Sequence, residues 1–255
     1  MDNIINLRKR MKRKLDPMRY EHTLSVSFTC MALAMRYGYD LEKAELAGLL
    51  HDCAKHFTDE ELILRCEKHG VLLDPADRMA PAVIHAKYGA WLAAHKYQIS
   101  DEEILEAIRC HTTGKPDMGM LDKILYIADF IEPRRNKAEN LPQMRALAFE
   151  DLDRTMYEIL KGTLGYLKKK NSFINPMTEQ AYAWYEARMA ERTAENEQED
   201  PKGQELAAGI RETTAAGSPR AGYGKGEYRY GTGQRDGKAG YQRPAREKRR
   251  GRSGH

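Results

Sequence analysis

Residues 46–55 read LAGLLHDCAK, an apolar helical segment that ends in an adjacent histidine and aspartate. Apolar residues recur at helical spacing from Asp40 up to this pair, which predicts one short helix that leads into His51 and Asp52. Two polar groups that close an apolar helix need partners, because burying them unpaired is costly. Taken alone, the pair is also explained as a histidine at a helix C-terminus beside a capping residue.

Helical periodicity continues on both sides of this segment. Leu24, Phe28, Met31 and Met35 keep one face of an N-terminal helix apolar, and Gly38 is expected to end it. Capping residues, stop signals and apolar spacing predict further helices over 58–70, from 74, over 82–95, 100–110 and 120–131, one between 141 and 170, and one over 178–190. No useful β-alternation occurs. The predicted fold class is therefore all-α, a helical bundle over residues 1–190.

The composition changes near residue 190, where an acidic Glu-rich stretch begins. Residues 220–255 hold 11 Lys or Arg and 3 acidic residues, a net charge of +8, with nine Gly and four Tyr and no Leu, Ile, Val, Met, Phe, Trp or Cys. Such a segment buries too little apolar surface to offset the entropy of ordering. Residues 191–255 are therefore predicted to be a disordered polar linker and basic tail, which could contact RNA non-specifically through its phosphates.

The four cysteines lie far apart and form no C-x-x-C pair. Reduced thiols in a cytoplasmic protein explain them, and the spacing excludes thioredoxin-like redox chemistry, zinc ribbons and disulfide scaffolds. No apolar run approaches the roughly 18 to 20 residues that cross a bilayer, so no membrane partner is expected. The basic N-terminus is not followed by the apolar region of a secretory signal.

Seven of the eight histidines lie between positions 22 and 111. A single aspartate, Asp129, interrupts the otherwise apolar helix LYIADF, residues 125–130, which suggests burial. A salt bridge to Arg134 or Arg135 is one explanation for it, and a metal is another. Imidazole and carboxylate ligands without thiolates suit Fe, Mn, Zn or Ni rather than a structural zinc cluster.

The order H…HD…H…H…D resembles that of the HD-domain metal-dependent phosphohydrolases. The resemblance is closest to the YqeK-like symmetrical dinucleoside-tetraphosphate hydrolases. It is carried by 19–22 (RYEH), 50–55 (LHDCAK), 84–90 (IHAKYGA), 111–114 (HTTG) and 126–134 (YIADFIEPR). The basic tail has no counterpart in that pattern.

The resemblance implies a helical bundle around two metal ions, with iron favoured and Mn, Ni, Co or Zn as alternatives. It implies that His22, His51, Asp52 and Asp129 hold one ion, and that Asp52 bridges to a second ion held by His85 and His111. The expected reaction is cleavage of diadenosine tetraphosphate into two ADP. Two adjacent cations can bind a phosphate oxygen jointly and lower the pKa of a water between them.

A four-phosphate substrate also needs cationic and polar protein contacts. Lys55, in His-Asp-x-x-Lys, is the first choice and, with Asp52, a predicted catalytic residue; a solvated helix lysine is the alternative. Arg19 shares a helical face with His22. The remaining predicted substrate contacts are Thr112, Thr113, Gly114, Lys115 and Arg134. For Lys115 and Arg134, a plain surface position is at least as good an explanation.

Three other functions share some of these features. An HD phosphohydrolase that acts on cyclic nucleotides, dNTPs or guanosine tetraphosphate would use the same ligands, and so would a di-iron oxygenase on the same fold. An RNA-associated regulatory module would predict a degenerate ligand set, which the full set of six argues against. A homodimer suits a helical protein of this size, although no residue argues for it.

Overall fold

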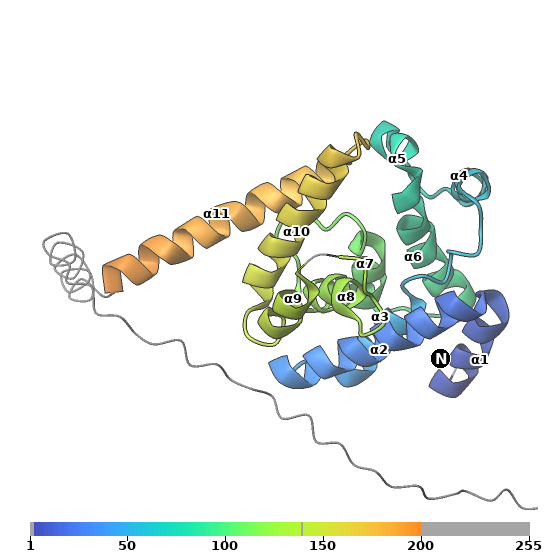
Figure 1. Cartoon of the computed structure of the whole chain (residues 1–255). Coiled ribbons are helices and arrows are strands. Elements are labelled where there is room, and N and C mark those ends of the chain that lie inside the picture. Colours follow the sequence, from blue (N-terminus) through green and yellow to red (C-terminus); the bar gives the residue numbers. More distant parts are fainter. Residues whose placement is uncertain (1–2, 139, 200–255) are drawn as a thin grey trace, which may run out of the picture. The chain divides into compact units, whose positions relative to one another are not determined.

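The computed structural model describes residues 3–138 and 140–199, and every regular element within them is helical (Figure 1). The helices are α1 (Ile4–Lys14), α2 (Pro17–Tyr37), α3 (Leu41–Leu50), α4 (Asp59–His69), α5 (Pro75–Met79), the 3₁₀ helix η1 (Pro81–Val83), α6 (Ile84–Tyr97), α7 (Glu102–Cys110), α8 (Met120–Ile131), α9 (Leu141–Leu147), α10 (Leu152–Lys169) and α11 (Pro176–Glu199). The all-α prediction is confirmed for these residues.

Local sequence signals set most helix ends as predicted. Thr58 and Glu61 form a reciprocal capping box at the start of α4, and Gly70 ends that helix in the left-handed conformation. Gly38 ends α2 in the same way. Two segments near the C-terminal end differ most from the prediction. The segment 141–170 holds two helices, α9 and α10, and α11 continues to Glu199 instead of ending at residue 190.

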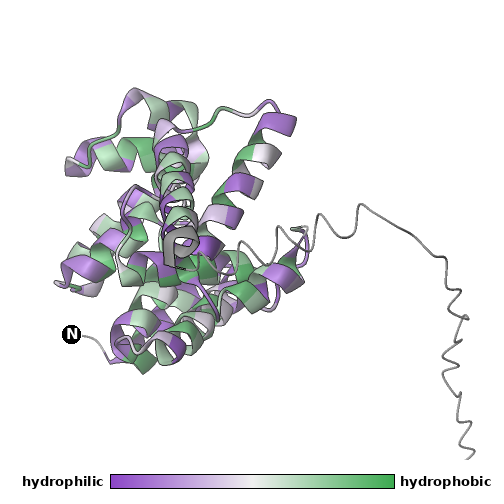
Figure 2. Ribbon diagram, turned by 90° about the vertical axis from the view of Figure 1, so that its left-hand side faces the viewer, coloured by the Kyte–Doolittle hydropathy of each residue, from purple (hydrophilic) through white to green (hydrophobic). Residues whose placement is uncertain are grey.

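Helices α2, α3, α7 and α8 enclose the core. Helix α2 packs along α3 and α8, α7 packs between α6 and α8, and α10 joins α8 to α11. Figure 2 shows hydrophilic and hydrophobic residues mixed along each helix, as expected for amphipathic helices around a shared core.

No helix in the described part of the chain is both long enough and apolar enough to cross a membrane. The predicted tail lies outside the described residues from 200 onward.

The buried face of α2 differs from the predicted apolar face. Phe28 and Met35, from the predicted apolar face, are 51% and 66% exposed. The buried face combines the apolar Val26 and Leu33 with small side chains that include Ser27, Cys30 and Ala34. Ser27 and Cys30 are the residues that meet Gly48 of α3, so small side chains lie where the two helices approach closely.

The closest point of this approach is Gly48 of α3. A Cβ built on Gly48 would lie 2.6 Å from the Cα atom of Ser27, which is backbone and cannot turn aside. We expect Gly48→Ala to lower the free energy of unfolding by about 3 kcal/mol, because overpacking pushes the two helices apart. Gly162→Ala in α10, where nothing lies within 4 Å, should raise it by about 0.8 kcal/mol. Urea unfolding of both variants checks this, and equal effects would contradict the packing argument.

Candidate metal centre

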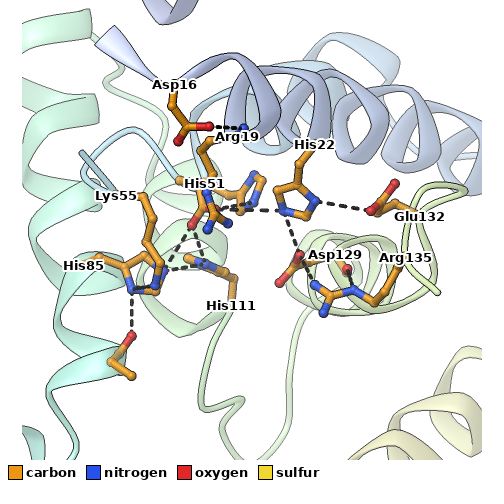
Figure 3. Close-up of polar contacts among 12 residues, drawn as sticks. Asp16, Arg19, His22, His51, Lys55, His85, His111, Asp129, Glu132 and Arg135 are labelled. Atoms are coloured by element: carbon orange, nitrogen blue, oxygen red, sulfur yellow. Dashed lines mark hydrogen bonds and ion pairs between the residues drawn. The ribbon is translucent and has the colours of Figure 1, made fainter. Parts of the chain in front are cut away.

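The structure brings all six predicted ligands together in the middle of the bundle (Figure 3). They come from five different helices or helix ends. His22 lies in the second turn of α2, the His51–Asp52 pair follows α3, and His85 begins α6, while His111 follows α7 and Asp129 lies in the last turn of α8. The spacing in the sequence thus reflects five helix segments that converge on one point.

Asp52 is the centre of this cluster. Its Oδ1 atom lies 3.2 Å from Nε2 of His85 and 3.8 Å from Nε2 of His111. Its Oδ2 atom lies 3.6 Å from Nε2 of His51 and 3.9 Å from Nε2 of His22. One carboxylate therefore faces a different histidine pair with each oxygen, an arrangement suited to a bridging ligand.

Three of the four histidines are oriented by local backbone. Nδ1 of His51, His85 and His111 lies 2.7, 2.8 and 2.7 Å from the carbonyl oxygen three residues earlier, and each of these rings turns Nε2 toward Asp52. A carbonyl acceptor at Nδ1 requires the proton there, which leaves Nε2 free as a ligand atom. The turn at each helix end supplies this carbonyl.

The ring nitrogens that face the centre lack ordinary partners. Nε2 of His51 is buried and has no hydrogen-bond partner. Nε2 of His85 and Nε2 of His111 lie 3.2 Å apart. Because the proton of each ring is on Nδ1, neither Nε2 atom can donate a hydrogen bond to the other. Buried nitrogen lone pairs of this kind fit a bound cation. Ligand atoms of His22, His51 and Asp129, and of His51, Asp52 and His111, lie within 4.8 Å of one another.

The protonation states also fit a cation. Burial lowers the pKa of His51 to about 4, and burial likewise lowers the pKa of His85. Burial alone would raise the pKa of Asp52, but His51, His111 and His85 outweigh it and hold that pKa well below its usual range. Neutral imidazoles, as at His51 and His85, beside a charged carboxylate are the forms that bind divalent metals. The fold and this cluster together indicate a divalent-metal site.

A second layer surrounds His22 and Asp129, and the sequence analysis missed one member of it, Glu132. The buried carboxylate of Glu132 lies 3.3 Å from Nδ1 of His22. Arg135 donates to Oδ1 of Asp129 and to its backbone oxygen, both at 2.9 Å, which is the ion pair with Arg135 that the sequence offered as one explanation for Asp129. Nε2 of His22 lies 3.2 Å from the same Oδ1 atom. The side chain of Asp129 is 24% exposed and thus less buried than its apolar neighbours suggested. A carboxylate at the C-terminus of α8, where the helix dipole disfavours it, was the available signal for Glu132.

Two predicted substrate contacts lie in the cluster. Arg19 donates from Nη1 to Oδ2 of Asp52 at 2.8 Å. Nζ of Lys55 lies 2.9 Å from Nδ1 of His85, and burial lowers the pKa of this lysine while Asp52 opposes the shift. Lys55 is therefore a half-buried residue of the site and not a solvated helix lysine.

The other predicted substrate contacts have different surroundings. Thr112 has a buried hydroxyl without a hydrogen-bond partner. The Thr113 hydroxyl donates to the oxygen of Gly114, and Gly114, with φ of 66°, donates its N–H to Cys110 at the end of α7. Lys115 forms ion pairs with Glu106 and Asp122 at 2.9 and 3.1 Å.

Arg134, like Lys115, is paired with a carboxylate. Its guanidinium pairs with the exposed Glu21 at 2.7 Å, while its backbone N–H donates to Glu132. Carboxylates thus pair with both Lys115 and Arg134 in this structure, and their roles as substrate contacts stay predictions.

Comparisons with known proteins agree with this geometry. Residues 19–134 match the HD domain family. The symmetrical bis(5'-nucleosyl)-tetraphosphatase of Bacillus subtilis is 40% identical over 177 residues, which cover 68% of this chain and 92% of that protein. The protein of the same name from Staphylococcus aureus is 36% identical over 66% of this chain and 87% of its own length.

A solved structure is similar as well. A crystal structure from Clostridium acetobutylicum, described as a predicted HD superfamily hydrolase involved in NAD metabolism, superposes with a TM-score of 0.71 at 36% identity. The match covers 74% of this chain and 99% of that one. The chain belongs to the HD-domain family and, within it, to the family of the symmetrical bis(5'-nucleosyl)-tetraphosphatases, and it is a hydrolase.

Proposed function

We propose that this protein hydrolyses diadenosine tetraphosphate symmetrically to two ADP. The observation that carries the proposal is the placement of Asp52, with one oxygen toward His85 and His111 and the other toward His22 and His51. Relatives that the match covers to 92% and 87% of their own length, and that carry that activity in their names, support the choice of substrate.

The donor set supports a centre for two metal ions. We propose that His22, His51, Asp52 and Asp129 hold one ion and that Asp52, His85 and His111 hold the other. Nitrogen and oxygen donors without thiolates are compatible with iron, our first choice, and with Mn, Ni, Co or Zn. When bound, such ions supply Lewis-acid charge to the phosphate and lower the pKa of a water molecule.

The cationic side chains of the site would bind and orient the polyphosphate. Arg19 and Lys55 bring two positive groups to Asp52 and His85, where negative charge from phosphate would accumulate. The unpartnered hydroxyl of Thr112 is a third candidate contact. The leaving group is ADP, whose terminal phosphate has a second pKa of about 6 and thus leaves without a strong general acid.

Several wider predictions accompany this function. The four cysteines are free and buried, which suits the predicted cytoplasmic location. RNA contact through the basic tail and a homodimer stay predictions.

Product analysis tests the proposed reaction. Protein loaded with Fe²⁺ or Mn²⁺ is incubated with diadenosine tetraphosphate, and nucleotides are separated by ion-exchange chromatography. ADP should be the only product. AMP plus ATP in equal amounts would contradict symmetrical cleavage. Turnover of a cyclic nucleotide, a dNTP or guanosine tetraphosphate without turnover of the dinucleotide would assign the site to another substrate.

A further inference from the structure

His22 is held differently from the other three histidines of the cluster. Nδ1 of His51, His85 and His111 meets a carbonyl three residues earlier, so those rings are oriented by their own turns. Nδ1 of His22 meets instead the Glu132 carboxylate, 110 residues away in the chain. The orientation of His22 therefore depends on the segment that follows α8.

That segment, residues 132–135, supports both outer ligands of one metal position. Glu132 reaches His22 with Oε1 and accepts the N–H of Arg134 with Oε2 at 2.7 Å. Arg135 holds Asp129 through two hydrogen bonds. In Figure 3 the side chains of Glu132 and Arg135 flank His22 and Asp129 on the side away from His85 and His111.

Arg145 of α9 holds this segment in place. Its Nε atom donates to the oxygen of Ile131 at 2.9 Å, and its Nη2 atom donates to the oxygens of Glu132 and Arg135 at 2.9 and 2.8 Å. Carbonyls at a helix C-terminus have no partner within the helix, and a guanidinium is suited to them by charge and by its fixed fork of donors. One side chain thus fixes the backbone on both sides of Glu132.

We propose that Arg145 and Glu132 are positioning residues that set the affinity of one metal position, the one formed by His22, His51 and Asp129, independently of the other. The inference rests on the metal centre of the proposed function. The position at His85 and His111 has no contact with residues 132–135 among the described interactions, because the carbonyls of Ala82 and Ile108 orient its histidines. Loss of the Arg145 or Glu132 contacts should therefore weaken one metal position and leave the other unchanged.

Metal binding, measured without substrate, tests this. Metal-stripped protein is titrated with Mn²⁺ by calorimetry, and the bound metal is counted after gel filtration. We expect Arg145→Ala and Glu132→Gln to weaken one Mn²⁺ position about 10- to 100-fold and to leave the other within about 2-fold. Glutamine has one acceptor oxygen, so it can satisfy His22 or the Arg134 N–H but not both.

Two further variants separate positioning from general damage. Arg145→Lys can reach one of the three carbonyls and should recover part of the affinity. Arg36→Ala is the matched control, because Arg36 also donates from Nε to a loop carbonyl, that of Phe149, away from the cluster. It should bind two Mn²⁺ as wild type does.

Different results would contradict the positioning role and the metal centre itself. Unchanged binding in Arg145→Ala, or an equal loss at both positions together with a lower thermal midpoint, would overturn it while leaving the metal centre intact in wild type. Wild-type protein that binds no Mn²⁺ would overturn the metal centre itself.

Discussion

Asp52→Asn should lower the turnover of diadenosine tetraphosphate roughly 10³-fold in metal-supplemented protein. The Asp52 carboxylate is the only group that faces both histidine pairs among the described contacts, and it carries the negative charge between them. Asparagine keeps the shape but removes the charge and one acceptor, so its amide NH₂ must face either His85 and His111, or His22, His51 and Arg19. Losing the charge stabilisation of a two-cation site costs several kcal/mol, and each 1.36 kcal/mol is tenfold in rate.

Steady-state kinetics and metal content are measured together for this variant. Asp122→Asn is the matched control, because Asp122 is also a buried aspartate, 5% exposed, but it pairs with Lys115 and caps α8. The control should keep wild-type turnover and metal content. A wild-type rate in Asp52→Asn would move the reaction away from this cluster, and an equal loss in both variants would point to a damaged fold.

The ligand cluster could be predicted from the sequence because its geometry is mostly local. His51 and His111 each follow a helix end, where the carbonyl three residues earlier orients the ring. Adjacent residues such as His51 and Asp52 must also share a site. A pattern of residue types at helix ends therefore carries enough information to indicate which side chains meet.

The supporting layer could not be predicted in this way. Glu132 meets His22, and Arg145 meets the backbone after α8, only because that connection folds back on itself. The buried face of α2 was also hard to predict, because both of its faces carry apolar residues: Val26 and Leu33 are buried, while Phe28 and Met35 are exposed. The carboxylate partners of Lys115 and Arg134 were hidden as well, because spacing does not show where the nearest carboxylates lie.

Lys55→Gln should lower kcat/KM roughly 100-fold while the metal content stays at two ions. Nζ of Lys55 lies 2.9 Å from His85 Nδ1, beside the second predicted metal position, so its ammonium stands where a phosphate of the substrate would bind. Phosphate favours the charged form of a half-buried lysine whose pKa burial has lowered. Removing one preorganised donor to developing negative charge typically costs 10²- to 10³-fold in rate.

The metal content separates this role from a structural one. Nδ1 of His85 keeps the carbonyl of Ala82 at 2.8 Å when the lysine is replaced, so the ring stays oriented as a ligand. Lys123→Gln, which removes the same charge from a half-buried lysine paired with Asp153, is the control and should keep the wild-type rate. Loss of one metal ion in Lys55→Gln would make Lys55 a support for His85. Wild-type kcat/KM with full metal content would remove it from the polyphosphate site and leave Arg19 as the cation nearest to Asp52.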